Sequence, residues 1–190
     1  MTESKENTRR VLEEFQRTGR LPSKEPLLEE EGMCVYAVTE AKKFRGTCIE
    51  VFRRFLGQIR ESDYVALMAY VDRSPRHEVL LQRLRHMIHK HYRVATMLGF
   101  GPQFLHSTGQ LYKGGPRKGL FLQITAEDSE DLSIPGEPYT FGVLKQAQAL
   151  GDVQSMTQRG LRVLEVRLGR DVKRGLGRLV HLVESAVQSV

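Results

Sequence analysis

Short apolar runs alternate with longer amphipathic stretches from Met33 onward, and this alternation limits the possible folds more than any other feature of the chain. The runs have the length of β-strands, and most are apolar at successive positions, as in strands buried on both faces. We predict five strands from them: Met33–Val38, Tyr64–Val71, Arg93–Leu98, Gly119–Thr125 and Leu161–Leu168. Because such strands need helices on both sides of the sheet, the pattern indicates an α/β fold with a mostly parallel sheet.

The stretches between the runs carry apolar residues at helical spacing. We predict helices over three of them: Glu40–Arg60 after the N-cap Thr39, Pro75–His91, and Asp171–Val187 with Asp171 as N-cap. Right-handed crossovers then give a doubly wound, flavodoxin-like three-layer sandwich. In such folds ligands bind beyond the carboxyl ends of the strands, so we expect function in the loops after Val71, Leu98 and Thr125.

The first 32 residues do not follow this alternation. Residues 6–18 have the spacing of a short amphipathic helix, with Gly19 beyond its end. Residues 21–32 contain two prolines and a run of three glutamates, which is typical of a linker. We therefore predict two parts: residues 1–32 as an extension that docks loosely or not at all, and residues 33–190 as the α/β domain.

Composition excludes several classes of protein. With 190 residues, 40% apolar and 27% charged, the chain is suited to one globular domain rather than to a disordered segment. No apolar stretch approaches the ~20 residues that span a bilayer, and the N-terminus lacks the apolar core of a secretory signal. Two cysteines imply no disulfide scaffold. These observations predict a cytoplasmic protein without a membrane partner.

The charge balance allows an anionic partner. There are 29 Lys and Arg residues against 23 Asp and Glu, a formal net charge of +6. Such a partner is a phosphorylated metabolite or nucleic acid, but solvated arginines on helix faces account for the excess more simply. His86 and His89 share a helix face, but the neighbouring arginines and the lack of further ligands argue against a metal site there. We expect no metal and no cofactor.

The glycine-rich segment after the third predicted strand is the strongest candidate for chemistry. Its potential ligand-binding residues are Gly101, Ser107, Thr108, Gln110 and Lys113. Glycine allows close backbone approach, the two hydroxyl residues suit a helix N-terminus, and the glutamine and lysine suit sugar hydroxyls and anions. His106 has a reference pKa near neutrality, about 6.5, as general acid–base catalysis requires. The alternative is a glycine-rich connection in which His106 caps a backbone group.

This segment also carries a resemblance to a known family. Residues 101–116 read GPQFLHSTGQLYKGGP, and three further stretches agree in order and spacing: 63–70 (DYVALMAY), 134–142 (IPGEPYTFG) and 147–152 (AQALGD). Together they resemble the second sugar-isomerase (SIS) domain in the glucose-6-phosphate isomerase portion of bacterial bifunctional transaldolase/phosphoglucose isomerases. The similarity covers roughly residues 33–182.

The resemblance implies an aldose–ketose isomerase that interconverts glucose 6-phosphate and fructose 6-phosphate. Enzymes of this family open the sugar ring and then move a proton between C1 and C2 through an enediol. The family's ring-opening histidine corresponds to His106, and its substrate-contacting glutamine corresponds to Gln110. The phosphate-binding loop of the family belongs to the first SIS domain. The resemblance therefore implies half of a two-domain site, completed by an upstream SIS/transaldolase domain or by self-association.

Two departures from the family pattern keep other functions open. Tyr112 stands where relatives usually have histidine, and the family's C-terminal lysine signature has only a weak echo at residues 141–145, which makes Lys145 a candidate for stabilising negative charge. We assign no residue as the enediol base. A non-catalytic sugar-phosphate-binding SIS module is therefore the alternative function, and a basic nucleic-acid-binding protein is the third.

Overall fold

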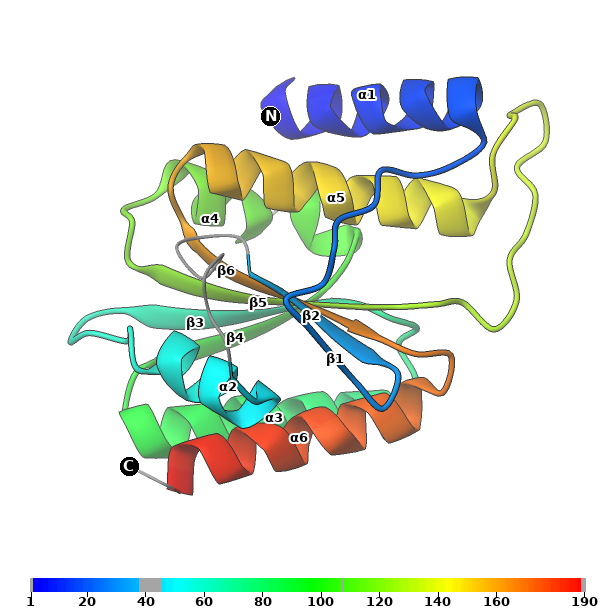
Figure 1. Ribbon diagram of the computed structural model, residues 1–190. Helices are drawn as coiled ribbons and strands as arrows, with labels where there is room; N and C mark the ends of the chain where they lie inside the picture. Colours follow the sequence, from blue (N-terminus) through cyan, green and yellow to red (C-terminus); the bar gives the residue numbers. More distant parts are fainter. Residues whose placement is uncertain (1, 38–45, 107, 189–190) are drawn as a thin grey trace.

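The computed structural model describes residues 2–37, 46–106 and 108–188, with side chains for residues 3–36, 46–104 and 109–188. It consists of one six-stranded sheet with helices on both faces (Figure 1). The α/β three-layer sandwich predicted from the sequence is therefore confirmed. No helix among the described residues is long and apolar enough to cross a membrane.

The sheet has the strand order β1-β2-β6-β5-β3-β4. Its parallel part consists of β3 (Tyr64–Tyr70), β4 (Ala95–Phe100), β5 (Gly119–Ala126) and β6 (Arg162–Leu168). A hairpin of β1 (Leu28–Glu30) and β2 (Met33–Ala37) continues the sheet antiparallel to β6. The prediction of five strands was therefore short by one, because β1 lies in the segment assigned to the linker.

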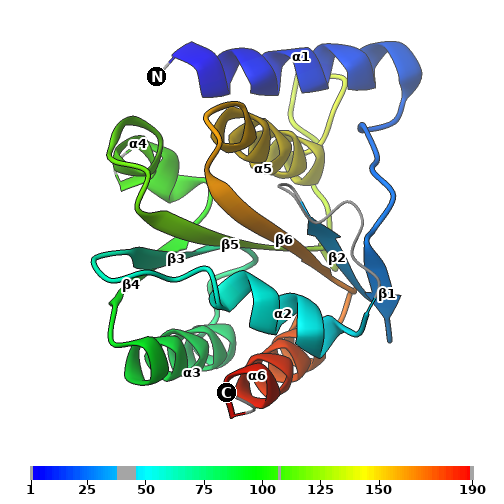
Figure 2. The same ribbon diagram turned by 60° about the vertical axis from the view of Figure 1, so that its left-hand side comes forward.

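The helices divide between the two faces of the sheet. One face carries α2 (Cys48–Leu56), α3 (Pro75–Tyr92) and α6 (Val172–Gln188). The other carries the 3₁₀ helix η2 (Gln103–His106), α4 (Thr108–Gly114) and α5 (Phe141–Gln158). Figure 2 shows α1 (Thr2–Thr18) lying on the outer side of α5, away from the sheet.

The core forms two clusters, one on each side of the sheet. Alternate residues of β3 contribute to them, since successive side chains of a strand point to opposite faces. Val65 and Leu67 pack toward α2, α3 and α6, whereas Met68 and Tyr70 pack toward α4 and α5. Both rows are buried, as expected of a strand covered on both sides.

The N-terminal segment is part of this fold. Asn7 and Val11 of α1 are buried against α5, and a Cβ placed on Gly151 would lie 2.8 Å from the backbone nitrogen of Thr8. Leu28 of β1 pairs with Val35 of β2. The prediction that residues 1–32 dock loosely or not at all is therefore wrong. The amphipathic spacing of residues 6–18 indicated a helix but not the surface on which it packs, and backbone pairing of a strand needs few apolar side chains.

The predicted helix boundaries hold at two helices and fail at one. Ser74 caps α3, and the Asp171 carboxylate accepts a hydrogen bond of 2.9 Å from the backbone N–H of Arg174 at the start of α6. In contrast, α2 begins only after Thr47, whose side chain and Glu50 form a capping box. A helix running continuously from Glu40 is therefore wrong, and the predicted cap Thr39 lies outside the described residues.

The path of the chain creates a topological switch point. From β3 the chain passes through α3 to β4 on one side, then returns through α4 to β5 on the other side of β3. In doubly wound sheets, such a reversal opens a crevice at the carboxyl ends of the two neighbouring strands. Here those ends are Tyr70 of β3 and Ala126 of β5.

Candidate functional site

The glycine-rich segment starts at the carboxyl edge of the sheet, next to this switch point. The backbone N–H of Gly101 donates a hydrogen bond of 2.8 Å to the carbonyl of Ala69 in β3. A Cβ on Gly101 would lie 2.6 Å from Cε1 of Tyr70. Glycine is therefore required at residue 101 because the chain passes directly over the Tyr70 ring. This is a packing role, in addition to any contact with a ligand.

An aromatic cluster anchors the segment to the sheet. The Tyr70 ring meets Phe104 edge-on at 5.6 Å between centroids, and Phe104 lies 6.4 Å from Tyr112 of α4. Tyr112 also packs against Phe121 of β5, and its hydroxyl lies 3.8 Å from the sulfur of Met97. Tyr112, which departs from the family motif, is therefore a buried core residue.

The central residues of the motif can be located only in part. The backbone of His106 belongs to η2, and Thr108 is the first residue of α4. The side chains of His106 and Thr108, and the whole of Ser107, lie outside the described residues. Their predicted roles in ring opening and ligand binding stay predictions.

Lys145 begins the second turn of α5, which follows the loop after β5. Its ammonium group forms an ion pair with Asp128 of that loop. Nearby, the Asp131 carboxylate accepts hydrogen bonds from the Thr140 hydroxyl (2.5 Å) and from the backbone N–H of Gly142 (2.7 Å) at the start of α5. The charge predicted to stabilise an enediolate is thus already balanced by a carboxylate.

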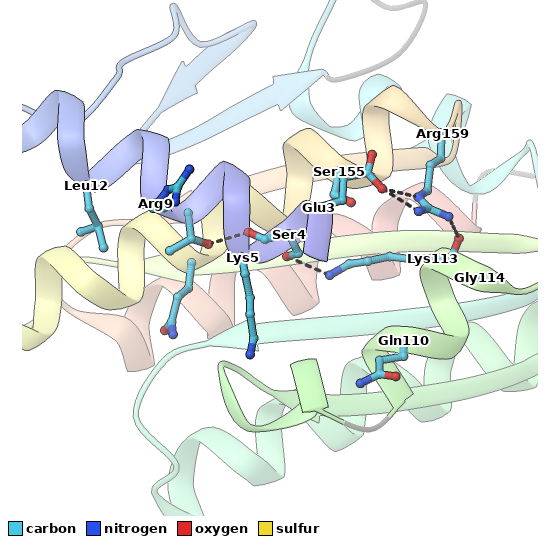
Figure 3. Close-up of a pocket in the computed structure, with 12 residues that line it drawn as sticks. Glu3, Ser4, Lys5, Arg9, Leu12, Gln110, Lys113, Gly114, Ser155 and Arg159 are labelled. Carbon is cyan, nitrogen blue, oxygen red and sulfur yellow. Dashed lines mark hydrogen bonds and ion pairs between the residues drawn. The ribbon is translucent and has the colours of Figure 1, made fainter. Parts of the chain in front are cut away.

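Gln110 and Lys113 line a different part of the surface. Figure 3 shows them in a groove between α1 and α4, with α5 behind it. The groove has a volume of about 410 Å³. Lys113 contacts Asp152, which follows Lys145 in α5 by seven residues, or about 10 Å along the helix axis. The structure therefore brings Gln110 and Lys113 together but separates both from Lys145.

Lys113 is held by groups that the sequence analysis did not single out. Its ammonium forms an ion pair with the fully buried Asp152 and donates a hydrogen bond of 3.1 Å to the Ser4 hydroxyl of α1. Burial raises the pKa of Asp152, while Lys113 opposes the shift. Lys113, which was predicted to bind substrate, thus neutralises the buried carboxylate of Asp152. The sequence analysis predicted no helix over α5, so it gave no signal that Asp152 would be buried.

Buried polar atoms without partners gather near this ion pair. Among the described residues, no hydrogen bond reaches the second carboxylate oxygen of Asp152, the Ser155 hydroxyl or the side-chain oxygen of Gln123. The Tyr70 hydroxyl lies near the Asp152 carboxylate and interacts with its charge, but it is not aligned for a hydrogen bond. Burial, and then the Asp152 charge, raise the pKa of the Tyr70 phenol.

A second cavity, of about 430 Å³, lies where the segment after α1 crosses β5, β6 and α5. Three of the charged side chains in its lining, Lys24, Glu165 and Arg167, form ion pairs. Lys24 lies 3.5 Å from the carboxylate of Glu165, and Arg167 lies 2.9 Å from that of Glu127. No group of three or more potential metal ligands occurs among the described residues.

Comparison with known proteins shows the fold alone. No protein-family model matches the sequence, and no curated protein matches it. The structure is similar to the crystal structure of the hypothetical protein TT0462 from Thermus thermophilus, with a TM-score of 0.60 and 22% sequence identity over 71% of this chain. The chain spans only 37% of the length of that protein.

Proposed function

We propose that the chain is one half of a sugar-phosphate isomerase site that interconverts glucose 6-phosphate and fructose 6-phosphate. The observation that carries the proposal is the packing of Gly101 over Tyr70. This contact holds the start of the GPQFLHSTGQLYKGGP motif next to the switch point between β3 and β5. Doubly wound folds bind their ligands at such a point. His106 follows in the same segment and has the near-neutral reference pKa that ring opening by acid–base catalysis requires.

The two carboxylates that directly follow β5 are already paired with basic side chains. Asp128 is paired with Lys145, and Glu127 accepts hydrogen bonds of 2.9 and 3.2 Å from Arg167 and Arg170. In this proposal a second domain or another copy of the chain supplies the base for the proton transfer between C1 and C2. We expect the chain by itself to bind substrate but to isomerise it poorly.

A specific observation favours a non-catalytic sugar-phosphate-binding module as the second candidate. Lys113 and Lys145, the two lysines predicted to act on substrate, are both engaged in ion pairs. A module that only binds needs neither of them for charge stabilisation. A nucleic-acid-binding protein, as the third candidate, would lose affinity steeply as salt increases, whereas binding of a sugar phosphate to a defined site would depend on the sugar.

The deciding experiment follows the interconversion of the α and β anomers of glucose 6-phosphate by exchange NMR, with the purified chain and with its His106→Ala variant. Acceleration of this exchange by the chain that is lost in the variant supports the isomerase half, because ring opening is the step assigned to His106. Substrate binding without exchange supports the non-catalytic module. Turnover by the chain alone at the usual ~1–10³ s⁻¹ contradicts the division of the site between two domains. Neither binding nor exchange contradicts both candidates.

A further inference from the structure

One part of the sheet presents polar side chains toward α5, where a sheet covered by helices normally presents apolar ones. The register places Tyr36 of β2, Glu165 of β6 and Gln123 of β5 side by side across three neighbouring strands. The side-chain N–H of Gln123 donates a hydrogen bond of 3.0 Å to the carbonyl of Ala149 in α5, so this row faces α5. The row adds little to the hydrophobic core, and two of its members, Tyr36 and Glu165, line the second cavity.

This cavity, of about 430 Å³, is of a size that suits a small molecule, since such sites occupy roughly 300–1,000 Å³. Strands β2, β5 and β6 form its floor, and α5 forms one wall. Residues 19–24 cover it, in the chain that runs from the end of α1 past α5 to β1 (Figure 2). The cavity lies on the β6 side of β5, whereas the proposed isomerase site lies on the β3 side.

Glu165 is the buried charge of the cavity, because its side chain is only 10% exposed. Its cationic partner among the described residues is Lys24 of the covering segment, whose ammonium lies 3.5 Å away and whose side chain is 45% exposed. The side-chain oxygen of Gln123, in the neighbouring strand, is buried and accepts no hydrogen bond from a described residue. Two adjacent buried acceptors with one distant donor favour a ligand that supplies a donor, and an ammonium group is a strong one.

The opposite charge lies two residues further along β6. Arg167 also lines the cavity, and it projects to the same face as Glu165 because side chains alternate along a strand. Its guanidinium lies 2.9 Å from the carboxylate of Glu127, but the two side chains are 44% and 39% exposed, so solvent weakens this pair. Residues two apart in a strand are separated by about 6.6 Å. Both charged groups can therefore contact one small molecule.

The rest of the lining favours a ligand that is both anionic and partly apolar. Arg20, Lys24 and Arg167 oppose the single carboxylate of Glu165 in the lining, so a ligand without an anionic group is disfavoured. The apolar side chains come from α1, the covering segment, β5 and α5: Phe15, Leu21, Pro22, Ala126, Ala149 and Leu150. An apolar group bound in the cavity would be removed from water by these side chains.

We propose that this cavity binds an α-amino acid with an apolar side chain. The ammonium group of the ligand binds Glu165, its carboxylate binds Arg167, and its side chain packs between the covering segment and α5. In the absence of ligand, Lys24 occupies the position of the ammonium group, so binding displaces Lys24 from Glu165. The site goes beyond the proposed isomerase activity and does not depend on it.

Isothermal titration of the full chain with three probes tests the ligand chemistry. The probes are L-phenylalanine, 3-phenylpropionate, which lacks the ammonium group, and phenethylamine, which lacks the carboxylate. We expect L-phenylalanine to bind and each of the other two to bind at least about tenfold more weakly, because each loses one charge-assisted contact. Equal affinity for either analogue would contradict the recognition of both charges. No saturable binding of L-phenylalanine at millimolar concentration would overturn the proposal.

Variants with opposite expected effects test the location. Glu165→Gln should weaken binding of L-phenylalanine by about tenfold or more, whereas Lys24→Gln should strengthen it several-fold, because it removes the competing ammonium. Lys173→Gln removes an exposed lysine from α6, on the opposite face of the sheet, and is the matched control for Lys24→Gln.

Thermal unfolding of each variant separates a loss of binding from a loss of folding. Wild-type affinity in a folded Glu165→Gln variant would overturn the site. If Glu165→Gln does not fold, Lys24→Gln decides the question, since its exposed ion pair contributes little to stability. Equal affinity in Lys24→Gln and Lys173→Gln would contradict the displacement of Lys24 and with it the placement of the ammonium group on Glu165.

Discussion

Lys113 of α4 forms an ion pair with Asp152, a fully buried carboxylate on α5. The same ammonium group donates a hydrogen bond to Ser4 of α1. One lysine therefore connects three helices on one side of the sheet. Removal of a charge from water is costly, and the ion pair offsets this cost only while both partners are present.

A double-mutant cycle measures this dependence. Lys113→Met leaves Asp152 buried without its counter-charge and should lower the free energy of unfolding by about 3–5 kcal/mol. Lys113→Met combined with Asp152→Leu should recover most of the loss, because two apolar side chains need no counter-charge. Urea unfolding followed by circular dichroism gives both values. Additive losses in the double variant would contradict a coupled ion pair.

A surface ion pair serves as the control for this cycle. Arg83 and Glu184 lie 3.4 Å apart between α3 and α6, and the arginine side chain is 60% exposed. Arg83→Met should cost less than about 1 kcal/mol, since solvent screens the attraction.

The pH dependence of Asp152 follows from the direction of its pKa shift. Burial raises this pKa although Lys113 opposes it. The contribution of the Asp152 carboxyl group to the free energy of unfolding is therefore complete below the unfolded-state pKa of about 3.9. This contribution is lost as pH rises through the folded-state pKa. Asparagine does not titrate, so the cost of Asp152→Asn should shrink as pH rises over this window. Unfolding by urea at several pH values measures it, and a cost that grows with pH would contradict the raised pKa.

Asp63 should show the opposite dependence. Burial alone would raise its pKa, but hydrogen bonds from the Arg162 side chain and the Arg60 backbone N–H lower it. Its contribution is therefore present above the unfolded-state pKa of about 3.9 and is lost as pH falls through the folded-state pKa. The cost of Asp63→Asn should be largest near neutral pH and should diminish in acid. The same urea titrations test this, and a cost independent of pH would contradict it.

Gly101→Ala tests the close approach at the switch point. The added methyl would lie 2.6 Å from the Tyr70 ring, which Phe104 holds in place. We expect a loss of about 1–3 kcal/mol, the usual cost of overpacking. Gly177→Ala in α6 is the control, because no atom lies within 4 Å of its added Cβ and alanine favours helix, so its stability should stay equal or rise. Equal effects of the two changes in thermal unfolding would contradict the contact.

Cys48 should be unreactive in the folded protein. Burial, followed by a hydrogen bond with Glu30, raises the pKa of this thiol to about 12. Only the thiolate attacks disulfide reagents, so Cys34→Ser, which leaves Cys48 as the one cysteine, should react with Ellman's reagent only after unfolding in urea. Reaction of the native variant at the rate of a free thiol would contradict a buried, protonated Cys48.

The candidate site was predictable to different degrees along the motif. The glycine at residue 101 and the strand before it indicated a turn at the sheet edge, and the structure has one there. The ion pairs of Lys113 and Lys145 were not predictable, because their partners Asp152 and Asp128 lie 39 and 17 residues away in sequence. Spacing along a chain indicates which residues share an element, but it does not indicate which charges meet between elements.

Hydropathy periodicity by itself determined the layered α/β fold, since strands that are apolar on both faces have few other ways to be buried. Tertiary structure alone decided the place of the N-terminal segment. Docking of α1 depends on the absence of a side chain at Gly151 and on a shared lysine, and pairing of β1 depends on backbone hydrogen bonds. The amphipathic spacing of residues 6–18 indicated a helix with one apolar side, but it did not indicate that α5 is its partner. The groove between α1 and α4, whose α1 wall the sequence assigned to no site, exists for the same reason.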